Sequence, residues 1–557
     1  MRLIFGYGPP LEFANPHARL FATTVDGAMD ALREAEGALR DGYWIAGTLA
    51  YELGAALHGI SHSHGPAPLL RLGVFDAPVP QGPLTAGPHA VLSPLLPRVN
   101  RAAYAAAIET LKRAIYDGDV YQVNYTVPFD VCIDGSAEAL WHAIAATTGA
   151  EYQAYFEDGD DRVLSWSPEL FLRFDGTRIE ARPMKGTALP ELAHELRDSK
   201  NRAEHIMIAD LLCNDLRRIA TDVAVESLMT LERYPTFLTL TSTIAGTISE
   251  GVRLEDIVRA TFPCGSVTGA PKRSAMEYIA RCEPDPRGTY CGSIGFLSPR
   301  RTGVWNVAIR TMQIRGTTGT FHAGGGIVAD SDASSEWNEI AVKSSFLRAY
   351  TAPLELLEAF ASNAAEEAVE AHLARLSASA SVFGVPLDSA ALRAHLTGVR
   401  ATNAAHMIRL RVSADGAFRT ATEPLVPVIE PVPICLAAAR VRSYDPFLRH
   451  KTAWRPAARA AWETARAHGC FDAVLRNERD ELTEGSRTNL YIELDGELWT
   501  PPVESGLLPG IGRSRIVTHG QARERVLTCD DLARADAVFV GNSARGILRA
   551  TMVQTAQ

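Results

Sequence analysis

Residues 304–350 read VWNVAIRTMQIRGTTGTFHAGGGIVADSDASSEWNEIAVKSSFLRAY. Residues 304–315 are rich in β-branched and other apolar side chains, which predicts a strand. Residues 334–350 place apolar side chains at helical spacing, which predicts a helix. The glycine cluster within 322–332 lies beside the strand pattern, and glycines let backbone N–H groups approach an anion closely. Strand and helix patterns thus alternate in this part of the chain.

The rest of the chain continues this alternation. Its periodicity predicts helices at 102–117 and 203–220 and a strand at 120–133, whereas the Pro-, Gly- and Ala-rich segment 65–97 predicts a loop-dominated connection. A different pattern begins near residue 354. We place the domain boundary within 350–356, so that domains 1–352 and 353–557 are joined by a short linker. In the second domain we expect a helix at 366–380 and strands at 406–412 and 432–442.

Bulk composition excludes several classes of protein. The 557 residues are too many for one core, and a net charge of -10 argues against nucleic-acid binding. No run of about 18 apolar residues exists and the N-terminus has no signal-peptide pattern, so we expect no membrane span. The eight cysteines form no CxxC pair, which is typical of a reducing cytoplasm.

Two carboxylates and a lysine share one face of the helix predicted at 334–350. Glu336, Glu339 and Lys343 are spaced i, i+3 and i+7. The spacing fits a surface ion pair between Glu339 and Lys343, and it also fits a Mg²⁺ site, because magnesium prefers carboxylate oxygens. Glu204, near the start of another predicted helix, is a possible third ligand.

A lysine lies in the apolar turn RPMKGT, residues 182–187. Lys185 is either a solvated loop lysine or a nucleophile, since a desolvated ammonium loses its proton more easily. The surrounding sequence decides between these alternatives.

Eight motifs occur in one order over about 220 residues: YQVNYT (121–126), SPELFL (167–172), RPMKGT (182–187), AEHIMIADLLCNDL (203–216), TFPCGSVTGAPKRSAMEYI (261–279), RGTYCGSIGF (287–296), VAIRT (307–311) and AGGGIVADSDASSEWNE (323–339). This order resembles the chorismate-utilising enzymes, which include anthranilate synthase, isochorismate synthase and component I of aminodeoxychorismate synthase. The resemblance implies a large α/β sandwich with the active site between the sheets.

The resemblance gives Lys185 a role that separates the reactions of this family. Anthranilate synthases have a small residue there, whereas aminodeoxychorismate synthases have lysine. The amine would add at C2 of chorismate as the C4 hydroxyl departs, and ammonia would then add at C4 and expel the lysine. Glu169 matches the general acid that protonates the departing hydroxyl. Gln122 replaces the lysine base of isochorismate synthases, which argues against isochorismate formation.

Further roles follow from the same resemblance. Glu204 and Glu339 match the Mg²⁺ ligands, with Glu336 close by. The matched contacts to substrate carboxylates are Tyr290, Arg310, Lys343 and the backbone of Gly325 and Gly326, and Lys272 also lies in a matched motif. Thr239 stands where the family commonly has histidine. No glutaminase motif is present, so a separate glutamine amidotransferase subunit is the implied ammonia source.

The second domain contains another candidate lysine, Lys451, in RHKTAWRPAAR (449–459). A lone basic cluster is usually solvated, but HLARL (372–376), ELTEGSRTNLYI (481–492) and TPPVESGLLPGIGRSRI (500–516) accompany it in the order seen in fold-type IV pyridoxal-phosphate enzymes. The resemblance, greatest to aminodeoxychorismate lyase, implies a fold-type IV aminotransferase-like domain in which Lys451 forms the Schiff base with pyridoxal 5'-phosphate and Glu484 pairs with the pyridinium nitrogen. The implied phosphate ligands are Arg375, Ile511, Gly512 and Ser543. Glu358-Ala359 departs from the family's Glu-Thr.

Together the two resemblances imply a cytoplasmic, bifunctional enzyme of 4-aminobenzoate synthesis, which supplies folate or a secondary metabolite. Chorismate would be aminated to aminodeoxychorismate, and the second domain would then eliminate pyruvate. The alternatives are anthranilate formation by the first domain, and a second domain that is a D- or branched-chain aminotransferase or a non-catalytic module. A homodimer through the pyridoxal-phosphate domain is a further expectation.

Overall fold

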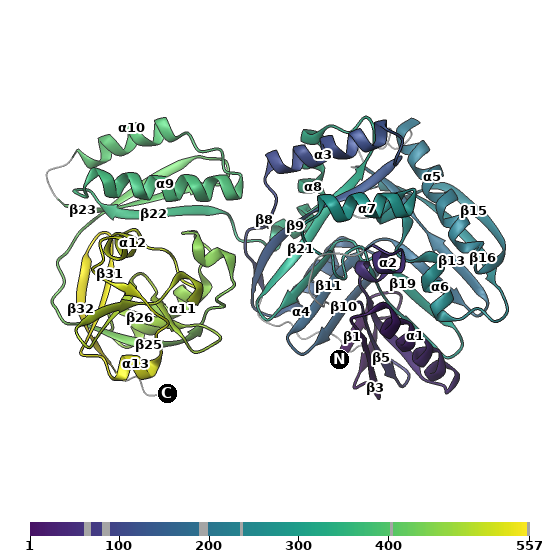
Figure 1. Cartoon of the computed structure of the whole chain (residues 1–557), viewed down its shortest axis with the longest axis horizontal. Coiled ribbons are helices and arrows are strands. Elements are labelled where there is room, and N and C mark those ends of the chain that lie inside the picture. The colour runs from purple at the N-terminus through teal and green to yellow at the C-terminus, as the bar shows by residue number, and fades with distance from the viewer. Residues whose placement is uncertain (61–67, 81–89, 189–198, 234–237, 402–404, 554–557) are drawn as a thin grey trace. The chain divides into compact units, whose positions relative to one another are not determined.

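The structure is a computed structural model that describes residues 1–60, 68–80, 90–188, 199–233, 238–401 and 405–553. The chain folds into two compact units, Met1–Thr351 and Ala352–Gln557 (Figure 1). Buried apolar side chains form separate core clusters in each unit. Within the described residues, no helix has the length and hydropathy needed to cross a bilayer.

The first unit contains two antiparallel sheets. One has the order β17 (Gly269–Ala270), β9 (Gln122–Asp134), β21 (Thr318–Ile327), β20 (Thr311–Arg315), β11 (Asp161–Ser167), β10 (Tyr152–Asp158), β1 (Arg2–Phe5), β2 (Leu11–Ala14) and β6 (Val79–Pro80), with β7 (Val91–Leu92) and β8 (Leu96–Pro97) beside β9. The other has the order β14 (Met184–Ala188), β16 (Leu238–Ile248), β13 (Arg178–Arg182), β12 (Leu170–Asp175), β19 (Thr302–Asn306), β18 (Ser293–Leu297), β4 (Trp44–Leu49), β5 (Leu70–Phe75) and β3 (Ala18–Ala22), with β15 (Ala220–Arg233) beside β16.

Helices cover these sheets with their apolar faces. They are α1 (Val25–Arg40), α2 (Tyr51–Leu57), α3 (Arg101–Tyr116), α4 (Ala137–Thr148), α5 (Ser199–Leu216), α6 (Leu254–Thr261), α7 (Lys272–Cys282) and α8 (Ala333–Lys343). Helix α8 packs on β21, and α5 packs on β14, β15 and β16. The N-cap of α8 is Asp332, whose carboxylate accepts the backbone N–H of Ser335 at 2.9 Å. This cap fixes where the helix that carries Glu336 and Glu339 begins.

The stretch 304–350 folds differently from its predicted pattern in three places. The single strand predicted at 304–315 is two strands, β19 and β20, which belong to different sheets. The glycine cluster, expected beside a strand, lies within one, because Gly324–Gly326 belong to β21. The helix predicted at 334–350 ends at Lys343 and is followed by a 3-10 turn, Ser345–Tyr350. Periodicity misses the first break because residues 307–309 are as apolar as the strands beside them.

Two other sequence predictions in the first unit are wrong. The helix predicted at 203–220 ends at Leu216, and β15 already begins at Ala220. The segment 65–97 contains β5, which pairs with β3 and β4, so its described part is more than a loop-dominated connection. The predicted helix at 102–117 and strand at 120–133 are confirmed as α3 and β9 within two residues at each end.

The second unit also contains two sheets. The smaller one, β22 (Glu355–Ala361), β23 (His406–Ser413) and β24 (Phe418–Pro424), shares a core with α9 (Glu366–Phe383) and α10 (Ser389–Arg400). The larger one has the order β27 (Leu482–Gly485), β26 (Asp472–Arg476), β25 (Val432–Arg440), β32 (Gly546–Met552), β31 (Ala537–Asn542), β28 (Asn489–Leu494), β29 (Glu497–Thr500) and β30 (Arg523–Glu524). Helix α11 (Pro456–Ala467) packs on β25 and β26, α12 (Ile511–Thr518) packs on β31, and α13 (Cys529–Ala533) packs on β28. The mixed α/β class is confirmed in both units.

Candidate active sites

The chain of the first unit passes from one sheet to the other at two places that lie side by side. At residues 168–169 the chain passes from β11 to β12, and at 307–310 it passes from β19 to β20. Backbone hydrogen bonds join the crossings, since Val307 N–H donates to the Glu169 carbonyl at 3.0 Å. The Ser167 hydroxyl adds a 2.5 Å bond to the Val307 carbonyl. Glu169 and Arg310 are therefore both placed where the chain moves between the two layers.

Glu169 has the environment of a carboxylic acid that holds its proton near neutral pH. Glu169 is 3% exposed, and its Oε1 atom has no hydrogen-bond partner among the described residues. Burial raises the pKa of Glu169 to about 7, although the Ser266 hydroxyl and the Lys185 ammonium act in the opposite direction. A carboxyl group with this pKa can donate a proton to a substrate oxygen.

Lys185 lies on β14, where it pairs with Leu240 of β16. A register shift follows it at Gly186, whose φ of 69° is a left-handed conformation that glycine adopts without strain. Thr239 supports this irregular part of β14, because its hydroxyl donates to the Gly186 carbonyl at 2.7 Å. Burial lowers the pKa of Lys185, while the negative charges of Glu204 and Glu169 raise it. The net decrease favours the neutral amine, which is the nucleophilic form.

Gln122 connects β9 to helix α5. Its side-chain amide donates to the Glu204 carboxylate at 3.0 Å. The amide also lies over Gly326, where an added Cβ would be 2.4 Å from the Gln122 Nε2. Any larger residue at 326 would have to displace Gln122, so the close approach depends on glycine.

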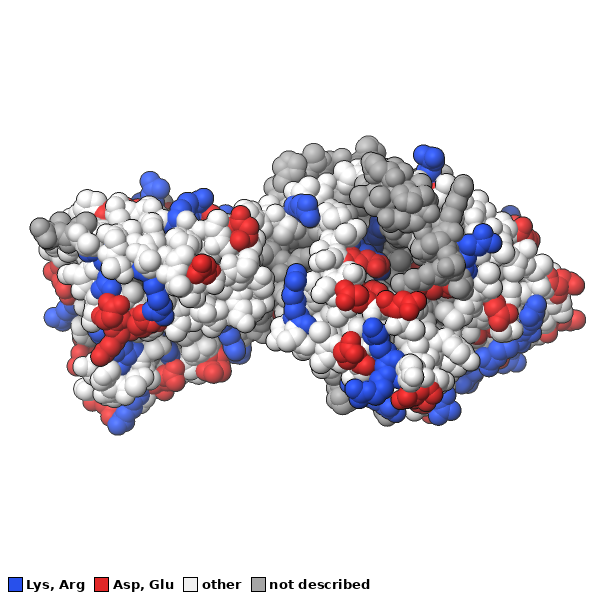
Figure 2. Space-filling model, turned by 90° about the horizontal axis from the view of Figure 1, so that it is seen from above, with Lys and Arg blue, Asp and Glu red and all other residues white. Residues whose placement is uncertain are grey.

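Three charged side chains of α8 converge over Gly325. An added Cβ there would lie 3.2 Å from Lys343 Nζ, 3.4 Å from Glu336 Oε2 and 3.7 Å from Glu339 Oε1. The predicted Glu339–Lys343 ion pair is present at 2.7 Å, and Lys343 also donates to the Gly324 carbonyl at 2.7 Å. Figure 2 shows a hollow in the first unit with acidic side chains along its rim.

The predicted magnesium ligands have suitable donor chemistry. Glu204, Glu336 and Glu339 supply carboxylate oxygens, and the charges of Glu204 and Glu339 both act on Lys185. Ser331 orients Glu336 by donating to its Oε1 at 2.7 Å. Over the described ranges, however, no group of three or more metal-type side chains is already arranged to hold an ion. The residues fit magnesium by type, and in this structure Glu339 forms an ion pair with Lys343.

The remaining predicted contacts have different surroundings. Tyr290 is buried and stacks on the ring of His322, with 5.0 Å between ring centroids. Arg310 has a positive φ of 49°, and its guanidinium lies 5.9 Å from the Phe346 ring. Lys272 donates to Asp215 at 2.6 Å and to the Thr261 carbonyl at 3.1 Å. A structural ion pair thus accounts for the burial of Lys272, and its contact with substrate stays a prediction.

The second unit has a cavity of about 170 Å³ around Lys451. Five of the six cofactor-binding residues predicted there line it, namely Arg375, Lys451, Glu484, Ile511 and Ser543. The sixth, Gly512, lies next to Ile511 at the start of α12, and an added Cβ would be 3.0 Å from the Ser543 backbone nitrogen. Burial and the nearby Arg455 lower the pKa of Lys451 to about 8.

Ion pairs orient the charged side chains that line this cavity. Arg455 donates to Glu484 at 2.6 Å, and burial raises the pKa of Glu484. Arg375 donates to Glu358 at 2.9 and 2.7 Å, which leaves part of its guanidinium for another anion. The N-terminus of α12 adds free backbone N–H groups, a usual site for phosphate. A primary amine, a buried carboxylate and two groups for a phosphate fit pyridoxal phosphate.

Family models match both halves of the chain. Residues 76–349 match the chorismate binding enzyme model, and residues 359–553 match the amino-transferase class IV model. The chain thus contains a chorismate binding enzyme domain followed by an amino-transferase class IV domain. The predicted order of the two domains is therefore confirmed.

Relatives of the chorismate-binding half have two different names. Aminodeoxychorismate synthase component 1 of Salmonella typhimurium is 36% identical over 46% of this chain and 59% of its own length. Anthranilate synthase component 1 of Neisseria gonorrhoeae is also 36% identical, over 42% of this chain and 50% of its own length. The chain thus spans between half and three fifths of these relatives, and identity alone does not separate the two reactions.

Solved structures support the fold of the chorismate-binding half. Anthranilate synthase component I from Streptococcus pneumoniae TIGR4 superimposes with a TM-score of 0.54 and 24% identity. The match covers 62% of this chain and 92% of that protein. This similarity shows the shared fold.

Several site residues were missed by sequence reasoning. Ser266 approaches Glu169, and His205 packs beside the β16 strand, 2.5 Å from the Ser242 hydroxyl. In the class IV half, His372 bridges Glu358 at 2.6 Å and Ser543 at 2.9 Å. Ser266 and His372 lie inside recognised motifs, and this position was the only sequence feature that could have identified them as site residues. Nothing in the local sequence indicated which groups they would contact.

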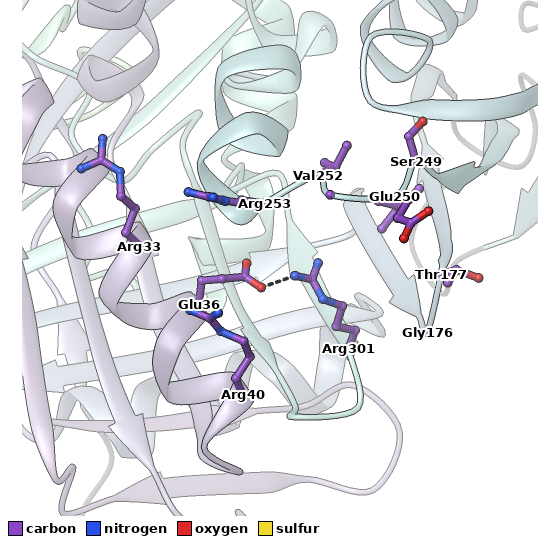
Figure 3. Close-up of a pocket in the computed structure, with 12 residues that line it drawn as sticks. Arg33, Glu36, Arg40, Gly176, Thr177, Ser249, Glu250, Val252, Arg253 and Arg301 are labelled. Atoms are coloured by element: carbon purple, nitrogen blue, oxygen red, sulfur yellow. Dashed lines mark hydrogen bonds and ion pairs between the residues drawn. The ribbon is translucent and has the colours of Figure 1, made fainter.

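A larger cavity of the chorismate-binding half contains none of the predicted site residues. It has a volume of about 560 Å³ and lies between α1 and the turns near residues 176, 250 and 301 (Figure 3). Its arginines include Arg301, which is paired with Glu36, and Arg33, which is paired with Glu255. These pairs neutralise much of its charge, so size alone does not make this cavity a reaction site.

Glu358 is expected to stabilise the class IV half. Its side chain is 1% exposed, and hydrogen bonds from His372 and Arg375 lower its pKa despite its burial. Replacing it with alanine leaves the half-buried Arg375 without its carboxylate partner, so Glu358→Ala should lower the free energy of unfolding by about 3 kcal/mol. Urea unfolding measures this change. Glu366→Ala removes an exposed partner of Arg400 and should cost about 1 kcal/mol or less; equal losses for the two variants would contradict the expectation.

Proposed function

We propose that the chain makes 4-aminobenzoate from chorismate in two steps, with aminodeoxychorismate as the intermediate. The observation that carries the proposal is the environment of Lys185. Burial lowers the pKa of its amine, and the charges of Glu204 and Glu169 act on it. Relatives named for anthranilate and for aminodeoxychorismate formation are equally identical to the chain. The choice between the reactions therefore depends on whether position 185 provides a nucleophile.

In the first step, Glu169 would protonate the C4 hydroxyl of chorismate, which leaves as water. The neutral Lys185 amine would add at C2 as the ring double bond shifts, forming a C–N bond and losing one proton. Ammonia would then add at C4 and give up one proton. The adduct nitrogen would take up a proton as the C2–N bond breaks, so that Lys185 leaves as a neutral amine. Since C2 is already occupied, the new amine is directed to the para position.

Other residues would hold the substrate. Glu204, Glu336 and Glu339 would bind a magnesium ion, which when present supplies positive charge for a ring carboxylate. Arg310, Lys343, Tyr290 and the backbone at Gly325 and Gly326 would contact carboxylate oxygens. A separate glutamine amidotransferase subunit would supply ammonia.

In the second step, the class IV half would release pyruvate from aminodeoxychorismate. Pyridoxal phosphate, when bound, supplies an electron sink for the substrate amine. Lys451 would hold the cofactor and move protons at the substrate, which its pKa of about 8 permits near neutral pH. Glu484 would face the ring nitrogen, and Arg375, Ser543 and the α12 N-terminus would bind the phosphate.

The identity of the aromatic product tests the proposal. Purified full-length chain is given chorismate, Mg²⁺ and an ammonium salt, and the products are separated by chromatography. We expect 4-aminobenzoate and pyruvate. Anthranilate as the main product would overturn the assignment in favour of the ortho reaction.

The first step is expected to slow as pH rises through about 7. Above that pH the proton that Glu169 must donate is lost, because its pKa is raised to about 7. Glu169→Gln should lower the rate about 10²-fold or more and remove this high-pH decrease. The rate of chorismate loss, measured at a constant concentration of free ammonia, checks both. If the rate of Glu169→Gln still falls at the same pH as that of wild type, the titration belongs to another group.

A further inference from the structure

The cavity around Lys451 has more cations than a bound cofactor would use. Its lining includes the cations Arg375, Arg409, Lys451, Arg455, Arg487 and Arg545, but only the carboxylates Glu423 and Glu484. Arg455 is paired with Glu484, Arg409 with Glu423, and Arg375 with the adjacent Glu358. Among the described residues, no carboxylate forms an ion pair with Arg487 or Arg545. These two guanidinium groups therefore remain for an anion from outside.

Arg487 is held in place by aromatic rings. Its guanidinium lies 4.2 Å from the Trp462 ring centroid and 4.4 Å from that of Phe471. It also donates to the Phe471 carbonyl at 2.5 Å. Stacking of this kind fixes a guanidinium in one plane, so little side-chain entropy is lost when it binds a carboxylate.

Arg545 approaches from the loop that follows β31, next to Ser543. Its Nη1 donates to the Val426 carbonyl at 2.7 Å, so it too is oriented by backbone. Burial and the like charges of Arg545 and Arg409 lower the pKa of Arg487. Asp472, whose charge acts on Arg487, accepts hydrogen bonds from the Ser486 hydroxyl at 2.5 Å and from the Thr488 hydroxyl at 2.6 Å. The charge of Asp472 offsets part of this repulsion, but within the described ranges no carboxylate forms an ion pair with either arginine.

We propose that Arg487 and Arg545 form a subsite for a second substrate carboxylate, so that the class IV half acts on amines with two carboxylates. This inference rests on the proposed function. A simple amino acid has a single carboxylate, and if that group lies beside the cofactor, this pair of cations is left without a counter-charge. The intermediate of the proposed pathway has a ring carboxylate and an enolpyruvyl carboxylate, and one of these would bind the pair. Arg487 and Arg545 are thus specificity-determining residues that lie outside the cofactor contacts.

Binding of isophthalate and benzoate to the cofactor-loaded full chain tests the subsite. The two probes differ by one carboxylate, and their dissociation constants are measured by isothermal titration calorimetry. Wild type should prefer isophthalate, and Arg487→Met and Arg545→Met should each reduce that preference about tenfold or more. The visible absorbance of the cofactor should stay unchanged, and Arg487→Lys should restore part of the preference. Arg466→Met, an exposed residue of the helix that carries Trp462, is the matched control.

The outcomes separate this inference from the proposed function. Equal binding of the two probes by wild type, or an unchanged preference in both methionine variants, overturns the subsite. Loss of cofactor absorbance in Arg487→Met and Arg487→Lys would assign Arg487 to cofactor binding and also overturns it. If wild type prefers isophthalate but forms no 4-aminobenzoate, the dicarboxylate subsite stands and the proposed pathway fails.

Discussion

Replacing Lys185 with alanine should lower aminodeoxychorismate formation by about 10³-fold or more, because no group would then occupy C2 of chorismate before ammonia adds. Burial and a lowered pKa make Lys185 the amine of the first unit that is prepared for this attack. Ammonia would be free to attack C2 itself, so any residual product should be the ortho amine, anthranilate. Chromatographic quantification of both amines measures the loss and the change in position.

A lysine that only binds substrate would behave differently. Lys185→Arg keeps a positive charge and should be as inactive as Lys185→Ala if the amine is a nucleophile. If the charge alone matters, Lys185→Arg should retain much of the activity, mainly with a raised KM. Retention of para-amine formation by Lys185→Ala at the wild-type rate would contradict the mechanism.

Replacing Lys451 with alanine should stop 4-aminobenzoate formation while aminodeoxychorismate accumulates. Lys451 is the amine that lines the cavity of the class IV half, with its pKa lowered to about 8. Without it the cofactor has no covalent attachment and the substrate has no proton carrier, so a decrease of about 10³-fold or more is expected. The amounts of intermediate and product are followed together, with the visible absorbance of the protein.

The first step is the internal control for this variant. Chorismate consumption by Lys451→Ala should equal that of wild type, which shows that the chain is folded. If 4-aminobenzoate is still formed at the wild-type rate, the class IV half is a non-catalytic module. If wild type transfers the amine to a keto acid and releases no pyruvate, that half is an aminotransferase.

Local spacing predicted the part of the first site that lies on one helix. Glu336, Glu339 and Lys343 share a face of α8 because of helical geometry, and the ion pair follows from it. Their convergence over Gly325 also requires α8 to pack on β21. The contact of Glu204 with Gln122 could not be derived in this way, since it requires α5 to pack beside β9. The resemblance assigned each residue a role in the same site, and the structure supplied the contact.

The sheet crossings were the feature that periodicity could not show. Residues 307–309 continue the apolar pattern of β19, yet the chain leaves one sheet there and enters the other. The same change of sheet places Glu169 in the interior and raises its pKa. Strand patterns record which side chains are buried but not which sheet buries them. The environment of Glu169 was therefore predictable only by resemblance.

In the class IV half, too, some site residues were predicted from the sequence and some contacts were not. Lys451, Glu484 and Ile511 are far apart in sequence, and the motif order alone brought them into one prediction. The pairing of Arg375 with Glu358 was not foreseen, because it depends on α9 lying against β22. Arg487 lies in the recognised motif 481–492, but its stacking on Trp462 and Phe471 could not be derived from that motif.

The most direct test is the mass of the peptide that contains Lys185. Wild-type protein is incubated with chorismate and Mg²⁺ without any ammonia source, quenched, digested and analysed by tandem mass spectrometry. The mechanism predicts that this peptide gains the mass of chorismate less one water, with the added group on Lys185, and that ammonia added before quenching removes it. Formation of the para amine by the same preparation with no adduct on Lys185, or with the adduct on another residue, would contradict the account.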